Sequence, residues 1–453
     1  MEYRFPVMDD KSKSNQAEIR LRGEKVGVLN RQPNKSFLFK YDDQYLLKKE
    51  AIAISVNFPI EKNEFLSPRL HPFFDNLIME GWLLNQTEKK FHIDKKNRWG
   101  LLMLVGANPI GAVSVHALDN KGQPINSGVE PKEEGTKLFP IEIVSKPGGC
   151  SFCLNPVKEM NLFHLACYKR LWGTTKTLFA RLDRMQPLQS FSKTTDNGSI
   201  SGAQRKGLFA LQKNELLVNS THSTYIFKPD GDYPEVSANE HLTMTVARHL
   251  KFDVPPTGLI RIENVGLVFV IKRFDRTIQN YKLLTEDMAQ IYEEASEDKY
   301  SLSHEKVGQA ILQYTQAGPL NLNDYFRRIL FCFLTANGDM HLKNWSLLEM
   351  EKNPGIYRLS PVYDWLNTRI ALPQEKNDLA ISLIGKKRNI QKSYFKRFAL
   401  DELNLNKTQV EKTFAEIPAW TQKLQELVPR SFLSEKMKKS YLYILKQRAS
   451  ILQ

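Results

Sequence analysis

Four side chains that can bind a metal ion or move a proton fall within the six positions 339–344. They follow a mostly apolar run, 328–334, that predicts a buried helix, and they are Asp339, His341, Lys343 and Asn344. Asp339 and Asn344 have the spacing of a protein-kinase catalytic loop, in which the Asp receives a hydroxyl proton and the Asn holds Mg²⁺. The same spacing fits an ordinary polar turn after a core helix, so the loop alone leaves both interpretations open.

A second carboxylate, Asp364, follows a short strand-like segment twenty residues beyond Asn344. Mg²⁺ prefers oxygen ligands and is held by one or two side chains together with substrate phosphates. Asn344 and Asp364 therefore suffice as the protein ligands of a magnesium–nucleotide site.

Two charged residues upstream fit the phosphate end of the same site. Lys228 lies on the predicted strand 225–229, at the position where a kinase holds the α- and β-phosphates of ATP. Glu240 lies near the start of a helix that we expect to run to residue 250. It has two competing roles, to close a capping box with Ser237 or to pair with Lys228 as a helix Glu pairs with the kinase strand Lys.

The segment 198–211 predicts a loop that runs into a strand. Its Ser, Gly and other small residues allow successive backbone N–H groups to cradle phosphates, and Lys206 adds positive charge. An ordinary hairpin turn is the alternative. The later segment 266–276 is a continuous apolar strand that ends in charge, which fits an edge between two lobes where adenine bonds to backbone.

Three of the four cysteines cluster in sequence with a histidine. The pairs are Cys150 with Cys153, then His164 with Cys167, each separated by two residues. Three thiolates and one imidazole make a tetrahedral set for Zn²⁺. The alternative is that these are buried apolar cysteines beside aromatic rings.

The rest of the chain supplies the elements that must position these groups. Residues 1–120 predict a small α+β module with short strands over 18–41, a further strand at 52–58 and an amphipathic helix at 73–82. Residues 121–145 are rich in Gly, Pro, Lys and Glu and predict a linker. Residues 146–280 then predict a mixed lobe, and residues 281–453 a mostly helical one.

Composition bounds the class of protein. The 453 residues are 42% hydrophobic and 25% charged, as expected for a globular protein with two or three domains. We see no secretory signal, no apolar run that would cross a bilayer and too few cysteines for a disulfide framework, so we expect a cytoplasmic protein. Residues 385–453 carry nine of the net +14 charges, which favours an anionic partner, with a solvated helical surface as the alternative.

Taken in order, these motifs resemble the HipA family, the bacterial Ser/Thr kinases that act as toxins in type II toxin–antitoxin systems. The motifs that carry the resemblance are Ser-Ile-Ser-Gly-Ala-Gln-Arg-Lys (199–206), Phe-Lys-Pro (227–229), Asn239-Glu240, Lys272-Arg273-Phe274-Asp275-Arg276, Glu286-Asp287-Met288, the loop 339–344 and Tyr363-Asp364. Gly-x-x-Val-Gly-x-Leu (23–29) and Phe-Phe-Asp-Asn-Leu (73–77) resemble the family's N-terminal subdomain, so the similarity covers nearly the whole chain.

The resemblance implies an α+β protein with a two-lobed kinase fold that uses ATP and Mg²⁺ to phosphorylate a protein hydroxyl. Family substrates include aminoacyl-tRNA synthetases, whose phosphorylation arrests translation. The resemblance also implies a small DNA-binding antitoxin as partner, with DNA contacted through that partner and no membrane association. Carried over by position, it assigns a catalytic Asp339, magnesium ligands Asn344 and Asp364, phosphate-binding Lys228 and Lys206, loop residues Gly202, Ala203 and Gln204, adenine-binding backbone at Lys272 and Phe274, and autophosphorylated serines Ser199 and Ser201.

Two residues depart from the family pattern, because Arg205 stands where Glu is common and Met340 where Gly is common. The Cys/His element resembles one that opens short-form relatives, which carry the N-terminal subdomain as a separate protein. This chain therefore resembles such a pair fused into one.

Two other functions use the same residues. The chain could be a non-catalytic antitoxin-binding or DNA-associated co-repressor with a kinase-like fold, or a kinase that acts on a small molecule. The complete set Lys228, Asp339, Asn344 and Asp364 favours catalysis over the co-repressor. A small-molecule kinase would differ only in its acceptor groove.

Overall fold

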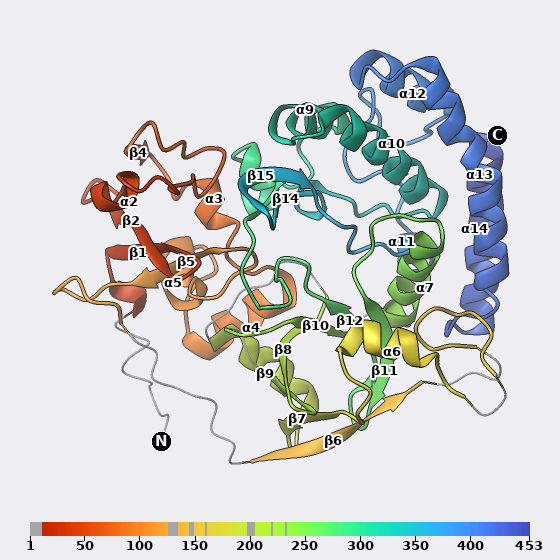
Figure 1. Ribbon diagram of the computed structural model, residues 1–453, viewed down its shortest axis with the longest axis horizontal. Helices are drawn as coiled ribbons and strands as arrows, with labels where there is room; N and C mark the ends of the chain where they lie inside the picture. The colour runs from red at the N-terminus through yellow and green to blue at the C-terminus, as the bar shows by residue number, and fades with distance from the viewer. Residues whose placement is uncertain are drawn as a thin grey trace.

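The computed structural model describes residues 11–125, 135–144, 149–158, 161–196, 204–218, 221–231 and 233–453. Figure 1 shows three parts, with an N-terminal module at the left, a β-barrel below and a helical lobe at the upper right. Within the described ranges, no helix combines the length and the apolar character needed to cross a bilayer.

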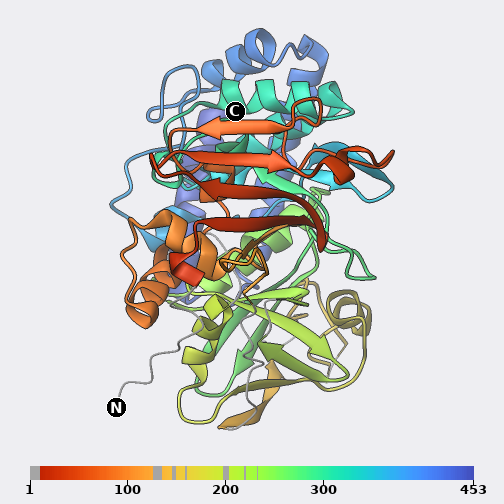
Figure 2. The same ribbon diagram turned by 90° about the vertical axis from the view of Figure 1, so that its left-hand side faces the viewer.

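The N-terminal module is built on a five-stranded antiparallel sheet, which faces the viewer in Figure 2. Its strand order is β4 (Glu64–Ser67), β3 (Phe37–Tyr41), β2 (Glu24–Arg31), β1 (Gln16–Leu21) and β5 (Val113–Ala117). Arg22 and Gly23 join β1 to β2 with φ of 56° and 90°, the left-handed pair that a tight two-residue hairpin requires. The module's helices are α2 (Asp43–Leu46), α3 (Pro72–Asp75), α4 (Gly81–Phe91) and α5 (Arg98–Val105).

A closed seven-stranded barrel forms the second part. Its strands, in spatial order, are β10 (Tyr225–Pro229), β12 (Gly266–Lys272), β11 (Thr257–Ile262), β6 (Thr136–Ile143), β7 (Phe179–Asp183), β9 (Glu215–Val218) and β8 (Gly207–Gln212). Closure removes exposed strand edges, which stabilises so small a sheet. The barrel is accompanied by α6 (Leu165–Trp172), the 3₁₀ helix η1 (Pro187–Asp196) and α7 (Val236–His249).

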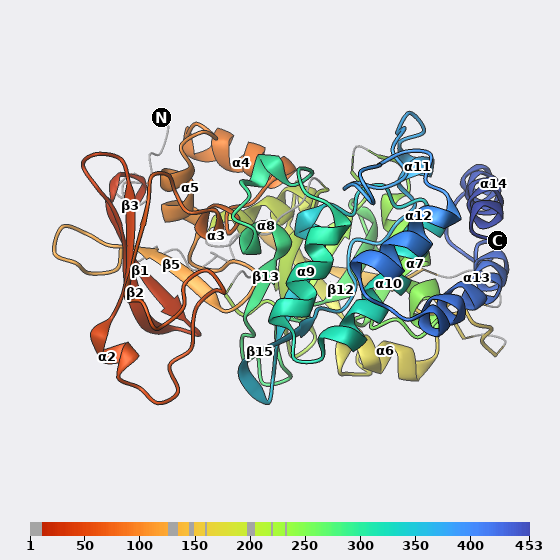
Figure 3. The ribbon, with the colours of Figure 1, turned by 90° about the horizontal axis from the view of Figure 1, so that it is seen from above.

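The third part is mostly helical, as predicted, around a small antiparallel sheet. That sheet holds β13 (Thr285–Asp287), β14 (Ser346–Met350) and β15 (Asn353–Leu359). The helices are α8 (Met288–Ile291), η2 (Ser296–Asp298), α9 (His304–Tyr314), α10 (Gly318–Leu334), η3 (Leu342–Asn344), α11 (Thr368–Ala371), α12 (Lys392–Arg397), the π-helical η4 (Phe398–Glu402), α13 (Lys407–Leu427) and α14 (Glu435–Leu452). Figure 3 shows α13 and α14 along the side opposite the N-terminal sheet.

Among the residues that the structure describes, the buried apolar side chains form two cores rather than three. Phe73 and Phe74 of α3 belong to the same buried cluster as Met288 of α8 and Phe331 of α10, whereas the barrel encloses a cluster of its own. The N-terminal module is therefore packed into the helical lobe as part of one hydrophobic interior.

Three segments differ from the sequence expectations. The predicted strand over 52–58 is wrong, because this segment is irregular and the N–H groups of Ile54 and Val56 donate to side chains, at 3.1 Å in each case. The predicted helix over 73–82 is interrupted, since α3 ends at Asp75 and α4 begins at Gly81. Part of the predicted linker forms the barrel strand β6.

A buried carboxylate joins the N-terminal module to β13. Glu286 accepts hydrogen bonds from the Ser55 hydroxyl at 2.6 Å and the Val56 N–H at 3.1 Å. Burial raises the pKa of Glu286 to about 7, against these two hydrogen bonds, which lower it. A carboxyl whose pKa is raised on folding favours the folded state most when it is protonated.

This shift predicts a pH dependence of stability. As pH rises from about 4.5, the model-compound value, to about 7, the folded value, Glu286 must ionise in a buried site and its contribution declines. Relative to Glu286→Gln, the wild type should lose roughly 3 kcal/mol of unfolding free energy across this window. Denaturant unfolding at a series of pH values measures the difference.

Glu263→Gln, at an exposed position between β11 and β12, is the matched control and should leave the pH profile unchanged. Parallel profiles of the wild type and Glu286→Gln would contradict the prediction. Other titrating groups, including Glu240, are present in both proteins and cancel.

Candidate active site

A buried lysine between two carboxylates forms the centre of the site. Lys228 on β10 places its ammonium 2.7 Å from the Glu240 carboxylate of α7, and it also forms an ion pair with Asp364. Burial opposes the charge of Lys228, yet the two carboxylates raise its pKa above the ordinary value. The ammonium is therefore held as a cation between the two lobes.

The two carboxylates differ in their surroundings. Burial raises the pKa of Glu240 to about 7, despite the nearby Lys228. Burial would also raise the pKa of Asp364, but the charges of Lys228 and Lys206 outweigh it and lower that pKa to about 2. Asp364 is thus ionised at neutral pH, as a ligand for a hard cation must be.

Glu240 forms an ion pair with Lys228 and takes no part in a capping box. The N-cap residue of α7 is Glu235, so the interpretation of Ser237 as the N-cap is wrong. The Ser237 hydroxyl instead donates to the Lys228 carbonyl at 2.9 Å, which ties the start of α7 to β10.

Hydrogen bonds to the backbone hold the segment that carries Asp364. Asp364 has a φ of 56°, a left-handed conformation that Asp tolerates better than bulkier residues, and its carbonyl accepts from Asn337 at 3.2 Å. Just beyond it, Asn239 of α7 exchanges two hydrogen bonds with the backbone of Asn367, at 2.8 and 2.9 Å.

The segment 339–344 follows α10, which ends at Leu334. Asp339 is partly exposed and accepts a 2.7 Å hydrogen bond from the Tyr300 hydroxyl. The Asn344 amide donates to the Asp339 carbonyl at 2.8 Å, which closes the six-residue loop on itself. Burial lowers the pKa of His341 to about 4, so this imidazole is neutral at physiological pH.

A pocket between the lobes gathers most of the predicted nucleotide-binding residues. Those that line it are Lys206, Lys228, Lys272, Phe274, Asn344 and Asp364. Glu240 lies behind Lys228, and Gln204 contacts the Pro229 carbonyl at 3.4 Å. Ser199, Ser201, Gly202 and Ala203 lie outside the described residues. The backbone N–H of Lys272 already donates to the Pro256 carbonyl at 2.9 Å.

Sequence reasoning missed the N-terminal module's share of this pocket. Asn76, Leu77 and Ile110 line it, and Lys343 of the segment 339–344 donates to the Asn76 side chain at 2.7 Å. The family motif at 73–77 could have marked this segment as part of the site. A local sequence pattern does not, however, predict which distant residues the segment contacts.

The Cys/His set also comes together. The ligand atoms of Cys150, Cys153, His164 and Cys167 all lie within 4.8 Å of one another, outside the pocket.

Comparisons with known proteins identify the family of this chain. Residues 198–424 match the family described as the HipA-like C-terminal domain, and residues 17–116 match the HipA N-terminal domain. The chain is 25% identical over 369 residues to "Putative kinase Y4dM" of Sinorhizobium fredii, covering 78% of this chain and 76% of that protein. It is 28% identical over 267 residues to a Haemophilus influenzae protein of similar name, covering 52% and 76% respectively.

A solved structure shows the same fold. The match is to a chain of the Shewanella oneidensis HipA, HipB and operator DNA complex, with a TM-score of 0.69, 19% identity and 96% coverage of both chains. Fold and site together define a two-lobed, kinase-like protein. The chain belongs to the HipA family, and two of its relatives carry the name of a putative kinase.

Proposed function

We propose that this protein is an ATP- and Mg²⁺-dependent Ser/Thr protein kinase that acts as the toxin of a toxin–antitoxin system. The observation that carries the proposal is the pairing of Lys228 with Glu240 and Asp364, with Lys228, Asp364 and Asn344 lining one pocket. A strand lysine, a helix glutamate and a metal-binding aspartate are the parts that protein kinases assemble for phosphoryl transfer.

Each residue has a role in this proposal. Asp339 accepts the proton of the acceptor hydroxyl, Asn344 and Asp364 hold Mg²⁺, and Lys228 and Lys206 neutralise nucleotide phosphates. The bound metal neutralises charge that develops on the transferred phosphoryl group. Backbone groups around Lys272 and Phe274 take the adenine. Since the Lys272 N–H is already bonded within the barrel, that residue would contribute its carbonyl.

The proposals for the acceptor and the partner rest on membership of the family. We propose a protein of the translation machinery as substrate, with an aminoacyl-tRNA synthetase as the first candidate, and a small DNA-binding antitoxin as partner in the cytoplasm. The Shewanella oneidensis relative was solved with HipB and operator DNA, which supports a partner that mediates DNA contact. We also propose that residues 1–120 correspond to a subdomain that short-form relatives carry separately, followed by the kinase lobes 146–280 and 281–453.

Loss of a catalytic or metal-binding group should abolish phosphorylation. Phosphoryl transfer depends on positioning and charge neutralisation, so Asp339→Ala, Asn344→Ala or Asp364→Ala should lower the rate by at least about 100-fold. Incubation with labelled ATP, Mg²⁺ and a bacterial lysate measures transfer to a substrate, and intact mass measures autophosphorylation.

Asp298→Ala, on the nearby 3₁₀ helix η2, is a control for removing a carboxylate and should retain activity. Full autophosphorylation by Asp339→Ala would contradict the mechanism. An inactive wild type that still binds antitoxin and operator DNA would favour the non-catalytic co-repressor instead.

Autophosphorylation of Ser199 or Ser201 should act as a brake. A phosphate there adds nearly two negative charges beside the nucleotide's own phosphates. In an Asp339→Ala background, Ser199→Asp and Ser201→Asp should each weaken ATP binding by roughly tenfold, as measured by calorimetry. Autophosphorylated wild type should show the larger loss.

Ser450→Asp, which adds the same charge at an exposed position on α14, should bind ATP normally. Equal ATP affinity in unphosphorylated, phosphorylated and substituted proteins would exclude the brake.

A further inference from the structure

The cluster Cys150, Cys153, His164 and Cys167 has the geometry of a metal site. A tetrahedral zinc ion with Zn–S near 2.3 Å sets its sulfur atoms about 3.8 Å apart and each sulfur about 3.5 Å from the imidazole nitrogen. The Nδ1 atom of His164 lies 3.4 Å from the Cys153 sulfur and 3.9 Å from the Cys167 sulfur. All three thiols in the cluster are free of disulfide bonds.

Hydrogen bonds around the cluster orient its ligand atoms for binding a cation. The Nε2 atom of His164 lies 3.0 Å from the Pro156 carbonyl, which can only accept, so Nε2 carries the proton and the Nδ1 lone pair faces the sulfurs. The backbone N–H of His164 points at the Cys150 sulfur, at 3.4 Å, as amides do toward metal-bound thiolates.

The chain forms a tight turn to bring the first pair together. The Leu154 N–H donates to the Cys150 carbonyl at 2.9 Å, and Leu154 has a φ of 60°, which is uncommon for a bulky residue. The second pair lies at the start of α6, where His164 is the N-cap residue. A turn and a helix start thus face each other with two ligands each.

We infer that Cys150, Cys153, His164 and Cys167 form a structural Zn²⁺ site. Four protein ligands leave no open coordination position, so the site holds the fold and does no chemistry on a substrate. Binding deprotonates the three thiols, and the released protons pass to solvent. The metal has no part in the proposed phosphoryl transfer.

The site braces the helix that carries Glu240. The Cys153 carbonyl lies 2.8 Å from Nε2 of His249 in the last turn of α7, and a Cβ added to Gly258 of β11 would come within 2.6 Å of the Phe152 ring. The turn is therefore packed between α7 and the barrel, and loss of the metal should loosen this side of the first kinase lobe.

Elemental analysis of the full-length protein, purified reduced and without chelators, should give close to one zinc per chain. Cys167→Ser should lose the metal. Cys332→Ala, which removes the cysteine outside the cluster in α10, should retain it. Titration of metal-free wild type with Co²⁺ should also give the visible absorption of a tetrahedral thiolate site, a readout that does not depend on any variant folding.

Folded, reduced wild type with no zinc and no thiolate–cobalt absorption would overturn the site. Equal zinc in the wild type and in folded Cys167→Ser would overturn it as well. Neither result bears on kinase activity, so this inference and the proposed function fail separately.

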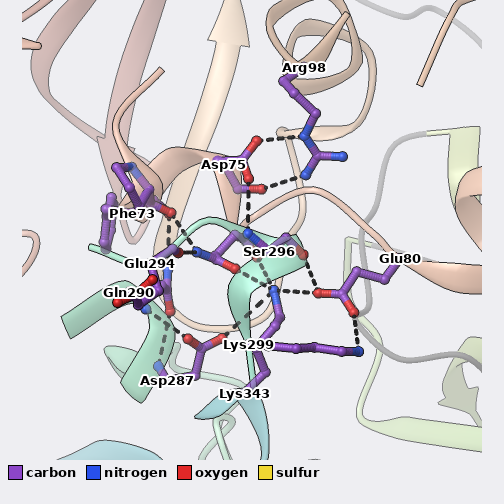
Figure 4. A network of polar contacts seen from close by, with 12 residues as sticks. Phe73, Asp75, Glu80, Arg98, Asp287, Gln290, Glu294, Ser296, Lys299 and Lys343 are labelled. Atoms are coloured by element: carbon purple, nitrogen blue, oxygen red, sulfur yellow. Dashed lines mark hydrogen bonds and ion pairs between the residues drawn. The ribbon is translucent and has the colours of Figure 1, made fainter. Parts of the chain in front are cut away.

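A second, independent observation concerns Glu80 of the N-terminal module. Figure 4 shows its carboxylate between Lys299 and Lys343, with ammonium distances of 3.0 and 2.9 Å. It also accepts from the Ser296 hydroxyl. Only 13% of the Glu80 side chain is exposed, and only 1% of the Lys343 side chain.

Each of these lysines precedes a residue that holds Asp339. Tyr300 follows Lys299 and donates to the Asp339 carboxylate at 2.7 Å. Asn344 follows Lys343 and donates to the Asp339 carbonyl at 2.8 Å. A backbone hydrogen bond also joins the two segments, which we call the two arms of the Asp339 site, because the Leu342 N–H donates to the Lys299 carbonyl at 3.0 Å.

We propose that Glu80 is a positioning residue that holds both arms of the Asp339 site from the N-terminal module. This inference rests on the proposed function, since it concerns the geometry of the catalytic Asp. Glu80 does not itself line the nucleotide pocket, whereas its partner Lys343 and the neighbouring Asn344 do, so its loss should misplace Asp339 most and weaken ATP binding less.

Glu80→Gln keeps the side-chain length but removes the charge that two lysines share. We expect kcat to fall between about 10- and 100-fold while KM for ATP changes less than about threefold. Hydrogen–deuterium exchange should be faster in Glu80→Gln over residues 299–301 and 340–345. Glu64→Gln, which breaks an exposed 3.0 Å pair with Lys40 in the same module, should change neither.

Unchanged exchange in both segments, or an unchanged or raised kcat, would overturn the positioning role. A parallel rise in KM for ATP would also overturn it, since that assigns Glu80 to nucleotide binding. If the wild type phosphorylates no better than Asp339→Ala, the proposed function fails and takes the catalytic role of Glu80 with it, whereas exchange still reports whether Glu80 holds the two segments.

Discussion

The ammonium group of Lys228 is the constraint on which the rest of the structure depends. Its side chain is 5% exposed, and removing such a charge from water costs several kcal/mol unless its partners are held in place. Those partners come from α7 and from the segment that follows β15, so β10, α7 and the helical lobe must keep one relative position. The amide pair between Asn239 and Asn367 reinforces it.

The N-terminal module is held by the same kind of interaction. Buried or half-buried charges on the helical lobe find their partners in this module, with Glu286 bonded to Ser55 and Lys343 bonded to Asn76 and Glu80. Removing the module would expose the apolar surface of the helical lobe that it covers and would remove the present hydrogen-bond and ion-pair partners of Glu286 and Lys343. The shared hydrophobic core and these contacts make the module a structural part of the kinase fold.

How far the sequence predicts the structure depends on whether the signal is local. The strand of Lys228 and the polar loop of Asp339 follow from short motifs and periodicity, whereas the two-lobed fold follows from the resemblance to the HipA family. The prediction of a strand over 52–58 failed although its apolar residues resemble a strand. Two of its backbone N–H groups donate instead to the distant side chains of Tyr41 and Glu286. Ser237 fits a capping box, but the charge of Lys228 competes more strongly for Glu240.

The two carboxylates that pair with Lys228 differ in solvent exposure, so the contact with Glu240 is fixed whereas the contact with Asp364 can be exchanged for a ligand. Glu240 is 1% exposed whereas Asp364 is 27% exposed, so solvent and ligands reach Asp364 and not Glu240. The pKa of Asp364, lowered to about 2, keeps it ionised, while burial holds that of Glu240 near 7. The proposed Mg²⁺ site beside Lys228 would use this division, because Asp364 can turn from the lysine to a cation while Glu240 continues to hold the lysine.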